Sequence, residues 1–326
     1  MAMTACVSSG GNLPSPLPLA KARRLSGLTK PEGVVTTPDG RLIVSDPDGA
    51  VAILSPDGGI SRIGKAPAAT GLAMDRQGRV IIANFGLLAD GNGPLQRLDL
   101  GTGAVETLAD SLDGRRLVAS NAPAIGPGGE VYCSHSTWAN PANIGTTDPA
   151  GFVYKVAADG RVSRVCDGIR GANGICFDRD FRHLYVAQTA AGTILRYRRG
   201  ADGSYRDPVQ YGPVLGLAPD NLSAGDIYGR MAPAERAALG HPDGVALDAA
   251  GNLWVTLPFA NRVVAITPTG QVVTILSDPE GQVMQMPTSL AWGGADLCDL
   301  SIVSRRNGAV LTLRTPIPGL PLPHWG

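Results

Sequence analysis

The sequence predicts an all-β fold, a six-bladed β-propeller with four-stranded blades, on the strength of three observations. One double-strand phrase recurs six times, most copies are followed by a second hairpin, and the two chain ends complete one blade between them. The composition agrees, because 43 Gly and 26 Pro among 326 residues supply turns while 44% hydrophobic residues supply a core. We therefore expect one propeller domain over residues 21–326.

The recurring phrase starts with a small or polar residue, here called the opener. It continues as an apolar strand, a turn that usually contains Gly, and a second apolar strand, as in EGVVTTPDGRLIVSD from Glu32. Gly in the turn provides the positive φ that tight hairpins need. Two hairpins per repeat, with successive openers 38 to 70 residues apart, make one four-stranded blade. The openers are Glu32, Thr70, Asn121, Asn173, Asp243 and Thr288.

The chain ends indicate how the ring closes. After Thr288 only three strands can be read, and the segment before Glu32, ARRLSGLTKPEG, resembles the segment before Asn173. We expect the N-terminal strand to complete the last blade, so that no long strand edge stays unpaired. Residues 1–20 are predicted to form a flexible tail.

Charge and targeting signals narrow the range of functions. Lys and Arg total 28, as do Asp and Glu, so the net charge gives no reason to expect nucleic acid or a membrane as a partner. The first twenty residues lack the basic start and apolar centre of a secretory signal. Five scattered cysteines favour reduced thiols and a cytoplasmic location. The expected partner is a small-molecule substrate, and the oligomeric state stays open.

The first strand of each propeller blade lines the central channel, so the openers should meet there. Glu32, Asn121, Asn173 and Asp243 would supply carboxylate and carboxamide oxygens, which hard divalent cations prefer. Two carboxylates without a cation would be costly in such a partly desolvated place. The alternative is that each opener is only a polar turn residue, a role that suits Asn and Asp.

Motifs around the openers carry a family resemblance. PEGV at 31–34, NGICF at 173–177 and HPDGVALDAAGNLWV at 241–255 resemble the senescence-marker-protein/gluconolactonase/luciferin-regenerating-enzyme family, and the similarity runs from Gly27 to Leu313. The resemblance implies a six-bladed propeller with one divalent cation on its axis, calcium first, with zinc or manganese as alternatives. It assigns the ion to Glu32, Asn173 and Asp243.

The resemblance also implies catalytic roles, with Asp243 as general base and Asn121 in contact with the substrate. One departure concerns the substrate. Sugar-lactone members of the family carry Arg two residues before the third opener, where this chain has Ala119, and their Asn-Asp-Gly becomes Asn121-Ala122-Pro123. This departure puts a sugar-acid substrate in doubt and favours a less polar or differently substituted one.

Long insertions are expected on the face that carries the openers, at about 85–94, 135–150 and 212–240. Loops of this length in a compact domain are usually functional. The 212–240 insertion is predicted to contain a short helix and to roof the channel. Residues predicted to contact a substrate, besides Asn121, are Thr70, Asn84, Phe85, His135, Trp138, Gln188, Thr256 and Thr288.

Two of these assignments have an alternative. His135 is either a second proton carrier or a hydrogen-bonded rim histidine. Phe85 and Trp138 either form apolar walls of the site or pack between blades.

The favoured function is a metal-dependent hydrolase of the carboxylic ester class that opens a lactone or similar cyclic ester. The ion would polarise the carbonyl, and Asp243 would activate water. One alternative is a metal-dependent hydrolase, lyase or isomerase of another carbonyl or phosphoester substrate. Another is a non-catalytic propeller that binds a ligand or protein. HExxH and GxSxG motifs and a phosphate-binding Gly loop are absent from the sequence.

Overall fold

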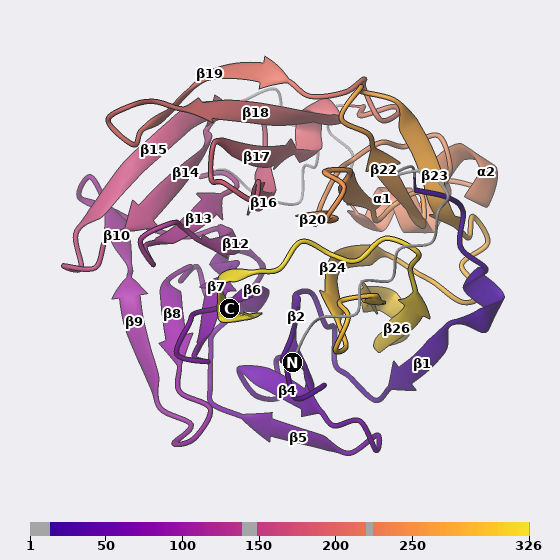
Figure 1. Ribbon diagram of the computed structural model, residues 1–326, viewed down its shortest axis with the longest axis horizontal. Coiled ribbons are helices and arrows are strands. Elements are labelled where there is room, and N and C mark those ends of the chain that lie inside the picture. The colour runs from indigo at the N-terminus through magenta and orange to yellow at the C-terminus, as the bar shows by residue number, and fades with distance from the viewer. Residues whose placement is uncertain (1–13, 139–148, 220–223, 326) are drawn as a thin grey trace.

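The computed structural model describes residues 14–138, 149–219 and 224–325. Its strands form six four-stranded antiparallel sheets arranged as blades around a central axis (Figure 1). The prediction of a six-bladed propeller is confirmed. In the described parts of the chain, no helix has the length and apolar character needed to cross a bilayer.

The first three blades follow one another along the chain, each running from the axis outward. Blade 1 contains β2 (Val34–Thr36), β3 (Leu42–Ser45), β4 (Val51–Leu54) and β5 (Ile60–Ile63). Blade 2 contains β6 (Ala69–Met74), β7 (Val80–Asn84), β8 (Leu95–Leu98) and β9 (Val105–Ala109). Blade 3 contains β12 (Ser120–Ile125), β13 (Val131–His135), β14 (Gly151–Val156) and β15 (Val162–Ile169). A two-stranded hairpin of β10 (Ser111–Leu112) and β11 (Arg115–Arg116) precedes blade 3.

Blades 4 and 5 repeat this order, and blade 6 takes its outer strand from the N-terminus. Blade 4 contains β16 (Ala172–Phe177), β17 (His183–Gln188), β18 (Thr193–Arg199) and β19 (Tyr205–Gln210). Blade 5 contains β20 (Val245–Leu247), β21 (Leu253–Leu257), β22 (Arg262–Ile266) and β23 (Val272–Ser277). Blade 6 contains β24 (Pro287–Gly293), β25 (Asp299–Ser304), β26 (Ala309–Arg314) and β1 (Arg23–Ser26).

The pairing of β1 with β26 closes the ring. Arg23 lies opposite Thr312 and Ser26 opposite Ala309 in an antiparallel register. The predicted completion of the last blade by the N-terminal strand is therefore confirmed. This pairing covers the edge of the six-residue strand β26, so that the four-residue strand β1 forms the outer edge of blade 6.

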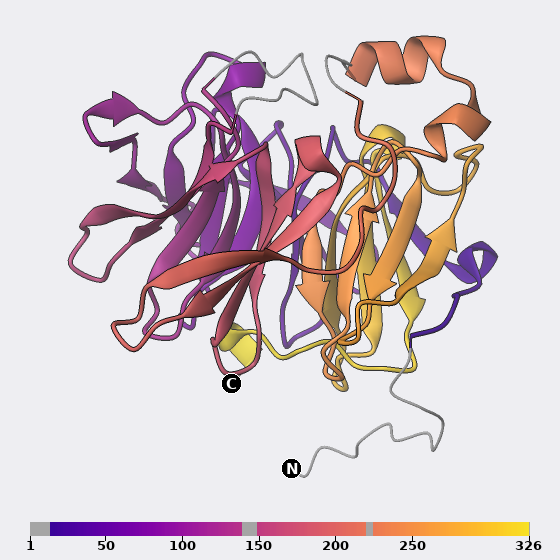
Figure 2. The same ribbon diagram turned by 90° about the horizontal axis from the view of Figure 1, so that it is seen from above.

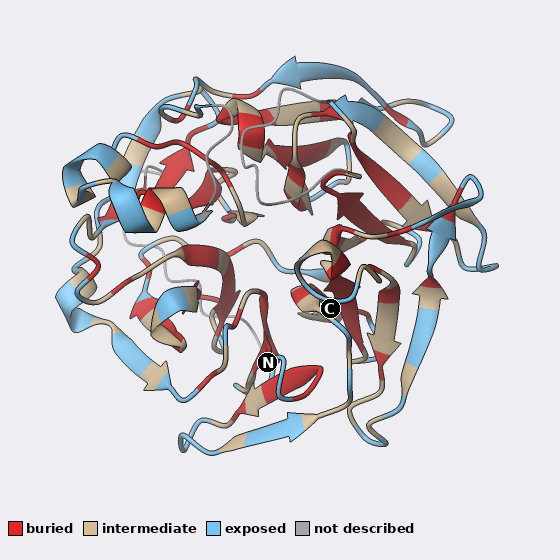
Figure 3. Cartoon of the chain, turned by 180° about the vertical axis from the view of Figure 1, so that it is seen from behind, coloured by how far each residue is buried: buried red, intermediate tan, exposed pale blue. Residues whose placement is uncertain are grey.

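The cores lie between neighbouring blades, because the inner strands are buried on both faces while the outermost strands are exposed (Figure 3). Strand β21 is buried throughout, whereas most of β19 is exposed. Between blades 5 and 6, Trp254 and Trp292 meet edge to face with ring centroids 5.1 Å apart. This arrangement is typical of aromatic pairs.

Part of the predicted tail packs against the propeller. Residues 1–13 lie outside the described residues, but the amide of Leu17 donates to the carbonyl of Ile275 at 2.9 Å. Leu17 and Leu19 pack against the core between blades 5 and 6, and a 3₁₀ turn, η1 (Leu19–Lys21), leads into β1. The attached chain thus begins before residue 21.

The 212–240 insertion forms two short helices, α1 (Ala224–Arg230) and α2 (Pro233–Arg236). They pack through Ile227 and Leu239 against Phe259 of blade 5. In Figure 1 they lie behind β22 and β23, to one side of the axis, and in Figure 2 they project from the face opposite the C-terminus. The predicted helix is present, but the two helices cover blade 5 rather than the channel. Residues 220–223 of this insertion and 139–148 of another fall outside the described residues.

Candidate active site on the propeller axis

Interruptions in strand pairing mark the openers. In four blades the pairing of the first strand with the second skips the opener and the residue that follows it, as between Ala69 and Leu72 or between Ala172 and Ile175. Such bulges re-aim side chains and are frequent next to functional sites. They free the opener from the regular alternation of the strand.

The openers of the six blades are here called the opener ring, and hydrogen bonds join four of the six neighbouring pairs of blades at this level. The Thr70 hydroxyl donates to the Asn121 carbonyl at 3.3 Å, and the Thr288 hydroxyl donates to the Glu32 carbonyl at 2.8 Å. The amides of Gly174 and Gly244 donate to the carbonyls of Asp243 (3.0 Å) and Thr288 (2.9 Å). Residues far apart in the sequence therefore meet on the axis, as predicted.

Glycine after the opener makes this approach possible. A Cβ at Gly33, Gly71, Gly174 or Gly244 would overlap a carbonyl oxygen of the next blade's opener. The sequence shows this as Glu-Gly, Thr-Gly, Asn-Gly and Asp-Gly pairs, and its physical cause is close packing of backbone against backbone.

Asn173 and Asp243, the openers of blades 4 and 5, form a polar pair in the ring. The Asn173 side chain hydrogen-bonds the Asp243 carboxyl, and its Nδ2 also donates to the Thr189 hydroxyl at 3.1 Å. Among the described residues, no hydrogen bond to the Asn173 side-chain oxygen is found. Burial raises the pKa of the Asp243 carboxyl to about 8, although the bond from Asn173 acts in the opposite direction.

Asn121 is oriented in the same way one blade earlier. Its Nδ2 donates to the Ser136 hydroxyl at 2.9 Å, and that hydroxyl donates to the Ala172 carbonyl at 2.7 Å. Thr189 has the corresponding role for Asn173 and donates to the Pro242 carbonyl at 2.7 Å. Both hydroxyls hold an amide nitrogen and tie two blades together.

Glu32 has a cationic neighbour inside the protein. Its carboxylate forms an ion pair with Arg305, the first residue of the 3₁₀ turn η4 (Arg305–Asn307) that follows β25. Both side chains are largely buried, with 16% and 23% exposure. Burial lowers the pKa of Arg305, and the guanidinium remains charged at neutral pH. Arg305 therefore balances the charge of one of the two acids in the ring.

The donor atoms fit a hard divalent cation. The ring offers carboxylate oxygens from Glu32 and Asp243 and a free amide oxygen from Asn173. Within the described ranges, no three His, Cys, Asp or Glu side chains cluster, so Asn oxygens would have to complete the ligand set. Asp243 has no ion pair with a described Lys, Arg or His side chain, and a bound ion would relieve the desolvation cost of its charge.

Three predicted contact residues anchor backbone instead. Asn84, His135 and Gln188 are each the last residue of a second strand. Their side chains accept hydrogen bonds from backbone amides two or three positions before the opener of the same blade. Asn84 Oδ1 accepts from Ala68 at 3.0 Å, and Gln188 Oε1 accepts from Arg170 at 2.9 Å. These side chains position the openers, and we do not carry them into the proposed substrate site.

His135 is fully buried between Trp138 and Phe152, with ring centroids 4.2 and 4.6 Å away. Its Nε2 accepts from the amides of Val118 and Ala119 at 3.2 and 3.1 Å, so the ring is neutral. Burial lowers its pKa to about 3. This geometry corresponds to the rim-histidine alternative and to aromatic packing for Trp138.

Of the remaining predicted contact residues, Thr256 links two blades and Phe85 lies at the position that supports the opener ring in other blades. Thr256 accepts from the Gly244 amide at 2.8 Å and donates to the Thr288 carbonyl at 3.0 Å, which fastens blade 5 to blade 6. Phe85 follows β7 directly, at the position that Ser136, Thr189 and Arg305 occupy in their blades. Its contact with a substrate stays a prediction.

Sequence reasoning missed Ser136, Thr189 and Arg305, although a signal was present. Each is the residue immediately after the second strand of its blade. Because side chains alternate along a strand, this position faces away from its predecessor, which binds backbone. Choosing the residue one position after the end of each second strand would have identified the residues that support the opener ring.

The fold and the ring define the class: a six-bladed propeller with an axial oxygen-donor site. Residues 30–306 match the SMP-30/Gluconolactonase/LRE-like region, and the chain belongs to this family. It is 28% identical to the 6-deoxy-6-sulfogluconolactonase of Pseudomonas putida over 52% of this chain and 54% of that protein. It is 25% identical to the pentonolactonase XacC of Haloferax volcanii over 55% and 50%.

These matches span about half the length of the curated relatives. Among solved structures, the calcium-binding protein regucalcin from Agrobacterium tumefaciens is similar, with a TM-score of 0.66 and 18% identity over 97% of this chain and 96% of that one. At this identity, the similarity establishes the fold.

Proposed function

We propose that the protein is a divalent-cation-dependent hydrolase that opens a lactone at the opener ring. The observation that carries the proposal is the Asn173–Asp243 pair in a ring of openers that also contains a second acid, Glu32, because these groups combine cation ligands with a base. The names of the curated relatives support lactone hydrolysis.

Each residue would contribute a distinct step. The Asp243 carboxylate would position the attacking water and accept its proton, a role that suits a carboxyl whose pKa lies near neutrality. Asn121 and Asn173, fixed by Ser136 and Thr189, would direct their oxygens toward the axis. A bound cation, with calcium as first choice, would polarise the lactone carbonyl.

The substrate class that we propose is a sugar lactone. The relatives named above act, by their names, on sugar-derived lactones. This evidence favours a polar substrate over the less polar one expected from Ala119. Ala119 is fully buried, and its amide is bound to His135, so position 119 does not reach the ligand space. The Arg305 guanidinium, on another blade of the ring, could meet substrate hydroxyls instead.

Acid release from glucono- and pentonolactones tests the proposal. We expect turnover with calcium, zinc or manganese, its loss with chelator, and a decrease in kcat of about 10²- to 10⁴-fold for Asp243→Asn. Asp178→Asn is the matched control, because Asp178 lies five residues after the opener Asn173 and pairs with His183. Full turnover by Asp243→Asn would refute the base role. Hydrolysis of a phosphotriester but of no lactone would favour the alternative chemistry, and absence of both would favour a binding protein.

A further inference from the structure

The channel contains a second feature, on the other side of the opener ring. A cavity of about 580 Å³, here called the lower cavity, is lined by the first strands of all six blades and by residues 320–325 of the C-terminal segment. This segment lies on the face opposite α1 and α2 (Figure 2). The cavity wall begins with the residues that directly follow the openers, such as Gly174 and Gly244, so it lies beyond the proposed catalytic site.

The lower cavity is wide because many of the side chains that line it are small. Three residues after each opener the cavity is lined by Val35, Ala73, Ala124, Cys176, Ala246 and Ala291. Larger apolar groups, among them Phe177, Phe181 and Trp292, complete it. Burial raises the pKa of the Cys176 thiol, which is therefore a neutral part of the wall. An apolar cavity of this volume is in the range of small-molecule sites, roughly 300–1,000 Å³.

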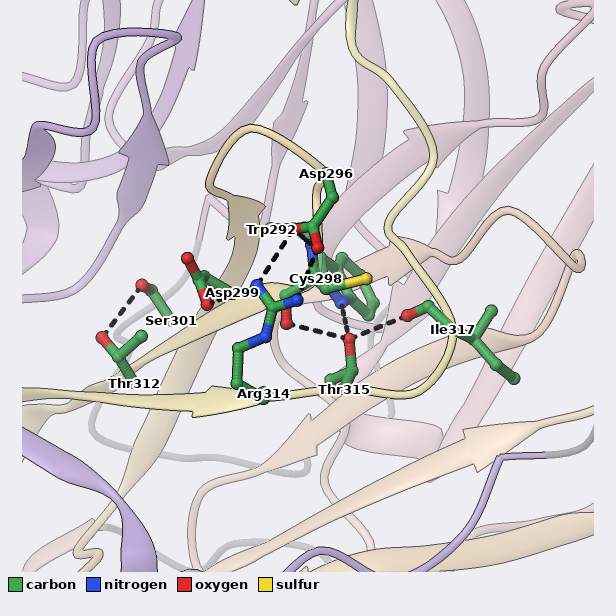
Figure 4. A network of polar contacts seen from close by, with 9 residues as sticks. All are labelled: Trp292, Asp296, Cys298, Asp299, Ser301, Thr312, Arg314, Thr315 and Ile317. Atoms are coloured by element: carbon green, nitrogen blue, oxygen red, sulfur yellow. Dashed lines mark hydrogen bonds and ion pairs between the residues drawn. The ribbon is translucent and has the colours of Figure 1, made fainter. Parts of the chain in front are cut away.

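The C-terminal segment is a fixed wall of the cavity. The Trp292 indole donates to the Thr315 hydroxyl at 3.1 Å, and that hydroxyl donates to the Ile317 carbonyl at 2.8 Å (Figure 4). Further along, the Leu320 amide donates to the Leu247 carbonyl at 2.9 Å, and His324 Nε2 donates to the Thr36 carbonyl at 2.9 Å. The segment is thus bound to blades 5, 6 and 1.

The rim of the cavity carries two arginine side chains. Arg76 and Arg179, in the turns after β6 and β16, line the cavity and are exposed, and neither forms an ion pair within the described ranges. Of the acids beside them, Asp75 pairs with Arg79 at 2.8 Å, and the Asp178 carboxylate is hydrogen-bonded to the His183 ring at 2.7 Å. Two free guanidinium groups next to an apolar cavity favour a ligand with an apolar body and an anionic end.

We propose that the lower cavity is a second binding site, for a small amphipathic carboxylate whose apolar part fills the channel and whose carboxylate lies at the rim beside Arg76 and Arg179. The site is independent of the proposed hydrolysis. It requires neither the cation nor Glu32 and Asp243.

Calorimetric titration of the full-length protein with decanoate and with decanol, both below their aggregation concentrations, tests the proposal. We expect saturable 1:1 binding of decanoate, at least tenfold weaker binding of decanol, and the same decanoate affinity with chelator present. The Arg76→Ala/Arg179→Ala double variant should lose the preference for decanoate. The control Arg161→Ala/Arg230→Ala, which removes two exposed arginines outside the cavity, should keep it.

Filling the cavity provides the second arm. Ala124→Trp should abolish binding, and the milder Ala246→Leu should weaken it at least tenfold while keeping the far-ultraviolet circular dichroism of the wild type. Binding that survives both substitutions, binding without preference for the carboxylate, or no binding of either probe would overturn the proposal. The last result would identify the cavity as a solvent channel. Lactone turnover is measured separately, so neither failure affects the other proposal.

Discussion

The two ends of the central channel are built from the same six strands but differ in chemistry and packing. At the opener ring, Gly174 and Gly244 bring backbones into contact and polar side chains face the axis. A few residues further along, small side chains such as Ala124 and Ala246 leave an apolar cavity. The difference teaches that strand repeats alone do not make a site in this fold. Bulges and glycines, which break the regular strand, concentrate polar groups at one end.

The largest effect should come from filling space at each end. In Gly174→Ala the new methyl group would overlap the Asp243 carbonyl oxygen, so we expect a loss of about 3 kcal/mol in unfolding free energy. Ala246→Val adds carbon to the lower cavity and should change stability by less than about 0.5 kcal/mol. Denaturant titration checks both variants. Equal destabilisation would contradict the contrast in packing between the two ends.

The next effect concerns the cation. Calcium at one hundred times its Kd should add about 2.7 kcal/mol to the stability of the wild type, visible as a higher Tm. Glu32→Gln should lose this increase because it removes a proposed ligand of the opener ring. Asp178→Asn, beside the lower cavity, should keep it. If calcium still raises the Tm of Glu32→Gln, the assignment of the cation to the opener ring is wrong.

Among the groups through which acid destabilises the fold, the buried His135 next to the opener ring should act strongly, while Asp243, whose pKa is raised to about 8, acts in the opposite direction. The pKa of His135 is about 3 in the folded state, against about 6.5 when unfolded, so the unfolded chain takes up the proton first and stability falls as pH drops below 6.5. Between pH 7.5 and 5.0 this group should cost about 2 kcal/mol. His135→Gln, which keeps an acceptor for the two amides, should lose that pH dependence.

His324, which lines the lower cavity, allows the same pH dependence to be compared at the other end of the channel. Burial lowers its pKa too, but hydrogen bonding to Thr36 opposes the shift, so His324→Gln should change the pH dependence less. Unfolding free energies measured across this pH range decide the point. A larger loss of pH dependence in His324→Gln than in His135→Gln would contradict this expectation.

The smallest effect should be on cation affinity. Arg305 neutralises Glu32, and a cation must compete with it for the carboxylate. We expect Arg305→Gln to bind calcium about tenfold more tightly, which corresponds to ~1.4 kcal/mol. Arg306→Gln is the matched control, because its guanidinium lies over the Tyr228 ring, 4.2 Å from the centroid. Weaker binding by Arg305→Gln would mean that the arginine orients Glu32 rather than competing for it.

Much of the architecture could be predicted from the sequence because it depends on repetition. The opener phrase recurs with recognisable turns, and the orphan strand before Glu32 has one place to go, so six blades and the closure by β1 followed. The convergence of Glu32, Asn173 and Asp243 followed from the same repetition.

The rest depends on geometry that repetition does not encode. Ser136, Thr189 and Arg305 were missed because one residue separates a side chain that binds backbone from one that supports the ring. The lower cavity reflects volume that small side chains leave unfilled, and its wall comes from a C-terminal segment outside the repeats. The placement of α1 and α2 over blade 5 depends on contacts such as that of Ile227 with Phe259, which no local pattern announces.

The union of β1 with β26 has a consequence for biosynthesis. Strand β1 is synthesised long before β26 and must wait for it before joining a sheet, so blades 1 to 5 can form while blade 6 is still incomplete. Glu32 follows β1 closely, and Arg305 and Thr288 belong to the same late blade. Until blade 6 forms, Glu32 therefore lacks both the Arg305 guanidinium that pairs with its carboxylate and the Thr288 hydroxyl that donates to its carbonyl.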